Sequence, residues 1–344
     1  MSFALYRLPY ADTYTEVRSE GKDMLLSNIE HIGCEEGFVV APFASTFFTP
    51  AVLIRPDSVE RHAVPTCGSV NGQKTVSSHA ASDDYKAAFT HFHDAISCGH
   101  FLKLVLSRSK EVTLHSTDYR ELFFEACRRY PRLMVMLVST KITGTWLVAS
   151  PEILLTGDGS WWRTMALAGT MTYEEGYQQW SEKNQQEQRF VEAYIEDRLS
   201  DFALEIIKDG PHTKRAGNLV HLCTDFRFRI AAGCHIGELL AALHPTPAVC
   251  GIPKAKAREF IANHESTPRS YYSGFMGPVG IGGESHLYVS LRCAKLGDGT
   301  ATLFAGGGIM PDSTLQSEWE ETEHKMQTIG SLLTQAEPDK QAKP

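Results

Sequence analysis

Apolar residues recur along the chain at two different intervals, one typical of helices and the other of strands. From Tyr85 to Ile96, large apolar residues follow one another at intervals of four, three and four, which predicts a helix. Ser82 is a suitable N-cap before this helix, and Gly99 is a suitable stop after it. A longer helix is expected over residues 181–209, which carry apolar residues at helical spacing and contain neither proline nor glycine.

Shorter apolar runs predict the strands of a sheet. They lie at residues 101–112, 133–139, 146–149 and 153–156, separated by polar or glycine-containing turns. Two more strands, residues 286–295 and 300–305, flank a Gly-Asp-Gly hairpin signal, and a closing helix is expected over residues 318–333. Because hairpins are mixed with long helices, we expect an α+β fold rather than a doubly wound parallel sheet.

One segment divides the chain. Residues 68–84 are poor in apolar residues and rich in glycine, serine, asparagine and aspartate, which is typical of a surface loop or linker. This segment separates a divergent N-terminal part, residues 1–67, from a more regular part, residues 85–335. Residues 336–344 are expected to form a flexible tail.

The composition is that of an ordinary globular chain, since 42% of its 344 residues are hydrophobic and 22% are charged. The formal net charge of −8 has the wrong sign for a phosphate backbone, so we expect no nucleic-acid partner. An anionic ligand would therefore have to be held by a few local cations or by a metal.

The eight cysteines are scattered and form no Cys-x-x-Cys pair, so the sequence indicates reduced thiols rather than a zinc site or a disulfide framework. The N-terminus lacks the basic region and apolar run of a secretion signal, and no stretch approaches the ~20 apolar residues of a membrane span. The sequence therefore predicts a cytoplasmic protein without a membrane partner.

Lys103 and Glu152 are the first candidates for chemistry. Lys103 lies inside an apolar strand, where loss of solvent would depress the pKa of its ammonium group and make a base available. Glu152 lies at a strand start, where apolar surroundings would let its carboxyl group act as a general acid. The alternatives are a lysine whose charged end reaches water and an ordinary edge-strand glutamate.

The closing helix carries a candidate cation site. Glu318 and Glu321 are three residues apart, so both carboxylates project from one helix face, with Lys325 one turn further along. Glu187, in the long helix, is a candidate third ligand because Mg²⁺ prefers oxygen ligands. A solvated charged helix face is the alternative.

Three other features suit an anion. The glycine run at residues 306–308 lets backbone N–H groups approach a ligand closely, although a strained turn would explain it equally well. Arg292 is a candidate clamp for a carboxylate, and Tyr272 offers a hydroxyl group.

Together these segments resemble the chorismate-utilising enzymes, in order from about residue 83 to residue 333. The resemblance rests on the motifs FLKLVLSR (101–108), SPE (150–152), LAGT (167–170), KNQQEQRFV (183–191), HPTPAVCG (244–251), SYYSG (270–274), LRCA (291–294), FAGGGI (304–309) and EWEETEHK (318–325). It implies two stacked, mostly antiparallel β-sheets with helices on the outside and the active site between the sheets.

The resemblance implies a role for each candidate. Lys103 would activate a water molecule for attack at C2 of chorismate, and Glu152 would protonate the departing C4 hydroxyl group from the other face. The family's Mg²⁺, bound by the ring carboxylate, would be held by Glu187 and Glu321, with Glu318 assisting through water. The implied substrate contacts are Lys325 and the backbone of Gly169 and Thr170 for the ring carboxylate, and Tyr272, Arg292 and the N–H of Gly306 for the enolpyruvyl carboxylate.

A few positions indicate the subfamily. Family members that use ammonia typically carry glutamine at the position of Lys103 or a nucleophilic lysine at that of Ala168, so we expect no amidotransferase subunit. Ala248 and Val249 resemble the isochorismate synthases, which are isomerases whose product enters menaquinone, siderophore or salicylate biosynthesis. A salicylate synthase, which also eliminates pyruvate, is the alternative. We expect a stand-alone monomer and leave a dimer open.

Two positions depart from the family pattern Lys-Asp-x-x-Glu-His in the long helix. Asn184 and Gln188 replace the aspartate and the histidine, whereas Glu187 is retained. The departures suggest weaker Mg²⁺ binding. They also leave open a third interpretation, a non-catalytic chorismate-binding protein.

Overall fold

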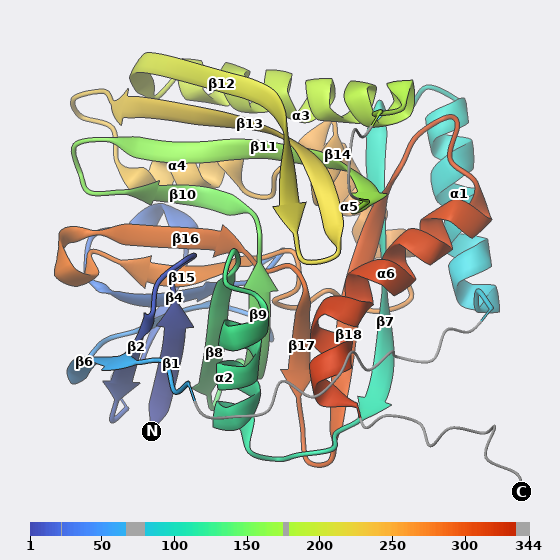
Figure 1. Ribbon diagram of the computed structural model, residues 1–344. Helices are drawn as coiled ribbons and strands as arrows, with labels where there is room; N and C mark the ends of the chain where they lie inside the picture. Colours follow the sequence, from blue (N-terminus) through green and yellow to red (C-terminus); the bar gives the residue numbers. More distant parts are fainter. Residues whose placement is uncertain (22, 67–79, 175–178, 335–344) are drawn as a thin grey trace, which may run out of the picture.

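The strands that the structure describes form two nine-stranded sheets, and the pairings between these strands are all antiparallel. The structure is a computed structural model that describes residues 1–21, 23–66, 80–174 and 179–334. In Figure 1 the strands of one sheet run across the view, and most strands of the other run upright. The predicted α+β class with two stacked antiparallel sheets is confirmed.

The first sheet has the order β14 (Gly251–Ile252), β7 (Lys103–Thr113), β18 (Thr300–Ile309), β17 (Cys293–Leu296), β9 (Gly144–Ser150), β8 (Met134–Thr140), β1 (Ser2–Arg7), β2 (Thr13–Ser19) and β6 (Ser58–Ala63). The second has the order β12 (Ala203–Ala216), β13 (Leu219–Ile230), β11 (Trp162–Thr172), β10 (Ile153–Gly157), β16 (Ser285–Val289), β15 (Phe275–Val279), β4 (Gly37–Ala41), β5 (Ala51–Ile54) and β3 (Met24–Leu26). The helices are α1 (Asp83–Ser97), α2 (Tyr119–Arg129), α3 (Glu182–Ser200), α4 (Ile236–Leu243), α5 (Lys254–His264) and α6 (Leu315–Leu333), with short 3₁₀ turns η1 (Ile29–His31) and η2 (Ile281–Gly283).

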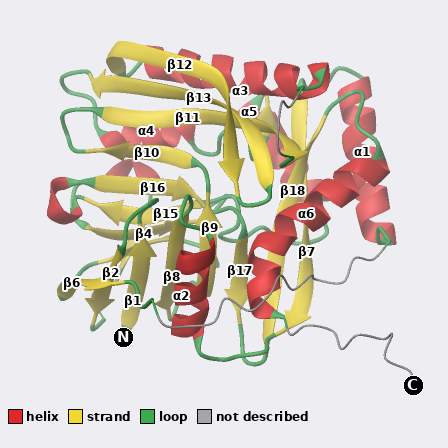
Figure 2. Cartoon of the chain, viewed as in Figure 1, coloured by secondary structure: helices red, strands yellow, loops and turns green. Residues whose placement is uncertain are grey.

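Strands that are buried on both faces explain the continuous apolar runs in the sequence. In β8, Met134 and Met136 pack into the core between the sheets, whereas Val135 and Leu137 pack outward against α2 and α6. This is the two-residue alternation of a strand. The outer face of the second sheet is covered in the same way by α3 and α4. Figure 2 shows the helices outside the layers of strands.

Most predicted elements are present. Helix α1 begins after Ser82, whose side chain accepts a hydrogen bond from the Tyr85 N–H as an N-cap should. Helix α6 begins three residues earlier than predicted, at Leu315 rather than Glu318. Most of the predicted linker, residues 68–79, and the predicted tail lie outside the described residues, and the division of the chain at residues 67 and 85 stays a prediction.

The prediction of one helix over residues 181–209 is wrong at its C-terminal end. Helix α3 ends at Ser200, and the chain re-enters the second sheet as β12, with Ala203 opposite Ile230 of β13. The neighbouring strand supplies the backbone hydrogen bonds that a continued helix would have made internally. Spacing within one segment carries no information about that partner.

The prediction of one strand over residues 286–295 is also wrong. These residues form β16 in the second sheet and β17 in the first, so the chain crosses from one sheet to the other between Val289 and Cys293. Arg292 lies in this crossover with φ 48°, an unusual conformation for a residue with a Cβ atom. The crossover places Arg292 between the two sheets.

The described residues contain neither a disulfide nor a membrane-spanning helix. Their seven cysteines are free thiols, as predicted for the whole set of eight. Within the same residues, no helix combines the length and the apolar character needed to cross a bilayer.

Candidate active site

A cavity between the two sheets gathers most of the predicted site residues. Its lining includes Glu152, Ala168, Gly169, Thr170, Glu187, His221, Ala248, Val249, Tyr272, Arg292, Gly306, Gly308 and Lys325. They come from both sheets, from helices α3 and α6, and from loops between these elements. Helix α6 runs beside β18 (Figure 1), and Lys325 of this helix lines the cavity.

Lys103 is fully buried at the start of β7, so the alternative of a side chain that reaches water is wrong. Its ammonium nitrogen lies 2.8 Å from Oε1 of Glu187 on α3. Burial raises the pKa of the Glu187 carboxyl, but the nearby Lys103 ammonium outweighs burial and the net pKa is lowered. Lys103 and Glu187 therefore form a buried ion pair.

Glu152 has the surroundings of a general acid. Only 2% of the residue is exposed, and burial raises the pKa of its carboxyl to about 7 against the opposing effect of the Lys103 charge. The Thr246 hydroxyl donates a hydrogen bond to Oε1 over 3.4 Å. Glu152 can therefore hold a proton near neutral pH, and the alternative of an exposed edge-strand glutamate is wrong.

The three predicted metal ligands are each paired with a lysine. Besides the pair formed by Lys103 and Glu187, Lys183 contacts Oε1 of Glu318 at 2.5 Å. In α6, Lys325 contacts Oε1 of Glu321 at 2.5 Å and donates to the carbonyl oxygen of Gly306 at 2.8 Å. We refer to Glu187, Glu318 and Glu321 as the lysine-paired carboxylates.

The lysine-paired carboxylates fit a divalent cation. Among the described residues, Oε2 of Glu318 is buried without a hydrogen-bond partner. Burial raises the pKa of this carboxyl, and the neighbouring Glu321 charge raises it further. A buried oxygen without a partner, next to a second carboxylate, is a favourable position for a hard cation.

The glycine run in β18 leaves room for these side chains. A Cβ atom at Gly308 would lie 2.4 Å from Oε1 of Glu187 and 3.0 Å from Cε of Lys103, and one at Gly307 would lie 2.8 Å from Oε2 of Glu318. All three distances are too short for ordinary packing. The run is therefore explained by close approach of functional side chains, and the strained-turn alternative is not needed, since these glycines lie in a regular strand.

His221 is a cavity residue that the sequence did not reveal. Its Nδ1 contacts the carbonyl oxygen of Gly169 at 2.9 Å, and its Nε2 lies 2.9 Å from Nη2 of Arg292. Burial and the Arg292 charge lower the pKa of His221 well below its usual value, so the ring is neutral. A polar residue inside the apolar start of β13 was the only signal in the sequence.

Arg292 and Tyr272 are placed to hold an anion. Burial lowers the pKa of the Arg292 guanidinium to about 10, which leaves it charged at neutral pH. Within the described chain, its Nε is buried and has no hydrogen-bond partner. Tyr272 is also buried, and its hydroxyl lies 3.0 Å from the position of a Cβ atom on Gly306. A carboxylate between these groups would complete the hydrogen bonding of the arginine.

The predicted backbone contacts at Gly169 and Thr170 lie beside the carboxylates. Gly169 has φ 70° and donates its N–H to Oε2 of Glu187 over 3.2 Å. The Thr170 hydroxyl lies 3.4 Å from Nδ1 of His221. The Gly169 N–H thus orients Glu187.

The two departures in α3 have structural partners. The Gln188 amide donates to the Ala166 carbonyl oxygen and to the Thr224 hydroxyl, each over 3.1 Å. Asn184 packs against Gly169, where a Cβ atom would lie 3.1 Å from its own. Gln188 therefore ties α3 to strands β11 and β13.

The fold and the cavity define a class of protein in which two antiparallel sheets enclose a site lined by both acidic and basic side chains. The family model described as "Chorismate binding enzyme" matches residues 57–334, and the chain belongs to this family. It is 32% identical to isochorismate synthase EntC of Escherichia coli (strain K12) over 238 residues, which are 66% of this chain and 61% of that protein. It is 29% identical to the vibriobactin-specific isochorismate synthase of Vibrio cholerae, covering 92% of this chain and 84% of that protein.

Solved structures show the same fold. The menaquinone-specific isochorismate synthase MenF from Escherichia coli superposes with a TM-score of 0.80 at 21% identity, covering 97% of this chain and 89% of that one. Anthranilate synthase component I from Streptococcus pneumoniae superposes with a TM-score of 0.68 at 15% identity, covering 95% and 89%. The chain spans 61% of EntC and 53% of the salicylate biosynthesis isochorismate synthase of Pseudomonas aeruginosa, less than two thirds of either.

Proposed function

We propose that this protein is a magnesium-dependent isochorismate synthase, an isomerase that converts chorismate to isochorismate. The observation that carries the proposal is that two buried residues, the basic Lys103 and the acidic Glu152, lie beside the same cavity between the sheets. The names of EntC, the Vibrio cholerae enzyme and MenF support it.

The reaction needs one base and one acid acting on opposite faces of the ring. To act as the base, the Lys103 ammonium must first lose a proton and leave its ion pair with Glu187. The amine then takes a proton from water as the water oxygen bonds to C2. The ring double bonds shift, the C4–O bond breaks, and the departing hydroxyl takes the proton of Glu152 and leaves as water. One water enters and one leaves, so the product is an isomer of the substrate.

Magnesium would be held by the lysine-paired carboxylates, where it would neutralise the ring carboxylate of chorismate and draw electrons from the ring. Glu187 and Glu321 are proposed as direct ligands, with Glu318 acting through water. Lys325 and the backbone of Gly169 and Thr170 would contact the same carboxylate.

The enolpyruvyl carboxylate would bind between Arg292, Tyr272 and the N–H of Gly306. Support comes from the buried Arg292 Nε, which has no partner among the described residues. His221 accepts a hydrogen bond from Arg292 at its neutral Nε2 and thereby orients the guanidinium group.

Salicylate synthase is the second candidate, because the same lysine and glutamate pair would form the same intermediate. Ala248 and Val249 line the cavity, so the two positions that separate these subfamilies can act on the substrate. They favour the isochorismate product.

The test is to incubate the purified protein with chorismate and Mg²⁺, with an EDTA-treated control, and to separate the products by chromatography. Isochorismate formed only with Mg²⁺ is the expected result. Salicylate released together with pyruvate would favour the second candidate. Unchanged chorismate that is nevertheless bound would contradict both and favour a binding protein.

A further inference from the structure

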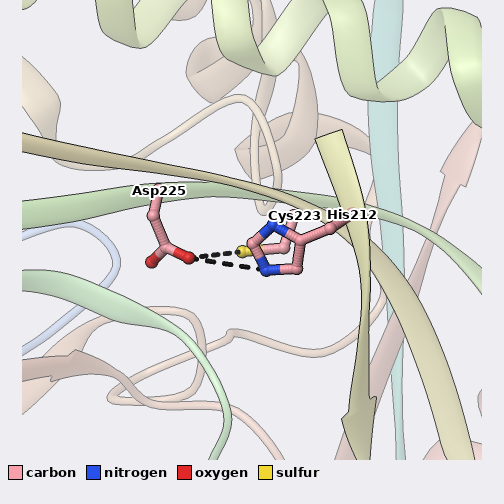
Figure 3. Close-up of side chains that lie close together, drawn as sticks. All are labelled: His212, Cys223 and Asp225. Atoms are coloured by element: carbon pink, nitrogen blue, oxygen red, sulfur yellow. Dashed lines mark hydrogen bonds and ion pairs between the residues drawn. The ribbon is translucent and has the colours of Figure 1, made fainter. Parts of the chain in front are cut away.

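A second group of metal-binding side chains lies on the hairpin formed by β12 and β13. His212, Cys223 and Asp225 place their ligand atoms within 4.8 Å of one another (Figure 3). Nε2 of His212 lies 3.5 Å from Oδ2 of Asp225, and Sγ of Cys223 lies 3.8 Å from the same oxygen. One carboxylate oxygen therefore faces both an imidazole and a sulfur.

The register of the hairpin assembles this group. His212 is paired directly with Cys223 across the antiparallel ladder, and Asp225 lies two residues further along β13, on the same face as Cys223. A bulge between Asp209 and His212 inserts one extra residue into β12. Without the bulge, Pro211 would stand opposite Cys223, and a proline offers no ligand.

Close backbone packing holds the bulge. A Cβ atom at Gly210 would lie 2.7 Å from the Cys223 carbonyl oxygen and 2.8 Å from Cα of Thr224. Only glycine allows this approach. This close backbone contact therefore supports the bulge that places His212 opposite Cys223.

The spacing fits a tetrahedral ion. With the usual zinc distances to nitrogen, sulfur and oxygen, two ligand atoms at a tetrahedral angle lie roughly 3.3–3.6 Å apart. The two separations to Oδ2 of Asp225, 3.5 Å and 3.8 Å, need only a small contraction, and the imidazole and the sulfur lie within 4.8 Å of each other. The other oxygen of Asp225, Oδ1, lies 3.8 Å from Nη2 of Arg163, which can orient the carboxylate from outside the site.

We propose that His212, Cys223 and Asp225 bind a thiophilic divalent cation such as Zn²⁺, with the fourth coordination position taken by water. The side chain of His212 is 43% exposed, which gives the ion an entry path, whereas Cys223 is fully buried beneath it. Because the ligands are nitrogen, sulfur and oxygen, this site differs in preference from the lysine-paired carboxylates, which offer only oxygen.

The two anionic ligands would offset the charge of a divalent ion. Burial raises the pKa of the Cys223 thiol to about 12, and the Lys214 charge opposes this shift, so the sulfur carries its proton in the ion-free protein. Binding replaces that proton with the metal and releases it to water. Thiolate and carboxylate then provide two negative charges against the cation and the neighbouring Lys214 and Arg163.

The experiment is a titration of the chelator-treated, full-length protein with Co²⁺ in an excess of Mg²⁺. We expect one Co²⁺ per chain with the absorption of tetrahedral cobalt and a thiolate-to-cobalt charge-transfer band, both removed by Zn²⁺. Cys223→Ser should abolish the charge-transfer band, and Cys234→Ser, the matched control outside the site, should keep it. His212→Ala should weaken Zn²⁺ binding by more than the roughly 10-fold to 100-fold seen for residues that only orient a ligand.

A second measurement separates loss of the site from loss of the fold. His212 is exposed, so His212→Ala should keep the thermal unfolding temperature of the ion-free protein while losing the increase that Zn²⁺ gives the wild type. A wild-type protein without the cobalt charge-transfer band, or a band that persists in Cys223→Ser, would overturn the proposal. So would equal stabilisation of the wild type and His212→Ala by Zn²⁺.

Discussion

Lys103 is fully buried, with Glu187 as its ion-pair partner. Burying an ion pair costs desolvation energy that the attraction between the partners often does not recover, so such a pair is weak evidence for a stabilising role. A lysine at this position is better explained by chemistry than by packing.

Replacing Lys103 by methionine should keep the volume of the side chain and remove the base. We expect kcat to fall by at least about 10²–10⁴-fold, the usual contribution of general acid–base catalysis. Steady-state assay of isochorismate formation checks this. Lys110→Met, in the same strand but paired with Glu323, is the control and should keep near-normal activity. Normal turnover by Lys103→Met would remove the base from the mechanism.

Glu152 gives a pH dependence whose direction follows from its pKa of about 7, raised by burial. As the proposed general acid, Glu152 must be protonated, so kcat/KM should fall as the pH rises through about 7. Thr246 donates a hydrogen bond that favours the ionised form. Thr246→Val should therefore raise the pKa and move the alkaline fall in kcat/KM to higher pH.

The pH profiles of the wild type and Thr246→Val, recorded in the same buffers, provide the measurement. A shift to lower pH in the variant would contradict the assignment of Glu152. The same raised pKa also predicts an effect on stability. The free energy of unfolding should fall as the pH rises from about 4.5, the ordinary pKa of a glutamate, to about 7, because over this pH range the folded state holds the proton more tightly than the unfolded chain.

At the scale of one element, strand β18 pairs with β7 in the first sheet, and its glycines leave room for the side chains of the candidate site. Gly308→Ala would place a Cβ atom 2.4 Å from Oε1 of Glu187, which must move away from its Gly169 and Lys103 partners. We expect the Mg²⁺ concentration for half-maximal activity to rise by about tenfold or more, equivalent to about 1.4 kcal/mol.

Gly297→Ala, in the hairpin before β18, is the matched control, because its Cβ atom would meet only the Thr300 carbonyl oxygen at 3.5 Å. Its Mg²⁺ dependence should be unchanged. Equal effects of the two substitutions would show that the glycine run serves the strand rather than the carboxylates.

Elements whose stability is local were predictable, and those that depend on a distant partner were not. Helix α1 has its own N-cap, so its start could be read at Ser82. The end of α3 depends on β13, which begins 19 residues after Ser200, at Leu219. His212 and Cys223 show the same limit: they are 11 residues apart in sequence, and only the register of β12 and β13 makes them neighbours.

At the scale of the whole molecule, the candidate site lies between the two sheets. The motifs that resemble the family identified most of the cavity residues, because each motif carries its own residue types. They did not identify the pairing of Lys183 with Glu318 or the contact of His221 with Arg292. Those contacts join strands and helices that only tertiary packing brings together.

The core between the sheets can be tested by its stability. Trp146 is fully buried there, and its ring stacks on Phe304 with 5.5 Å between centroids. Trp146→Ala should lower the free energy of unfolding by about 3–5 kcal/mol, measured by urea denaturation. Phe47→Ala, at a residue that is 92% exposed, should change it by less than about 0.5 kcal/mol. Similar values for both variants would contradict this description of the core.

The lysine-paired carboxylates have a consequence for how the protein would be supplied with the proposed Mg²⁺. Three lysines beside three glutamates cancel in charge, so this part of the chain has no need of a cation to offset repulsion while it folds. Small zinc domains, by contrast, remain unfolded until the metal arrives. A newly made chain can thus reach its final form in a cell short of magnesium and wait there. A shortage of Mg²⁺ would then lower the fraction of active molecules but leave the amount of folded protein unchanged.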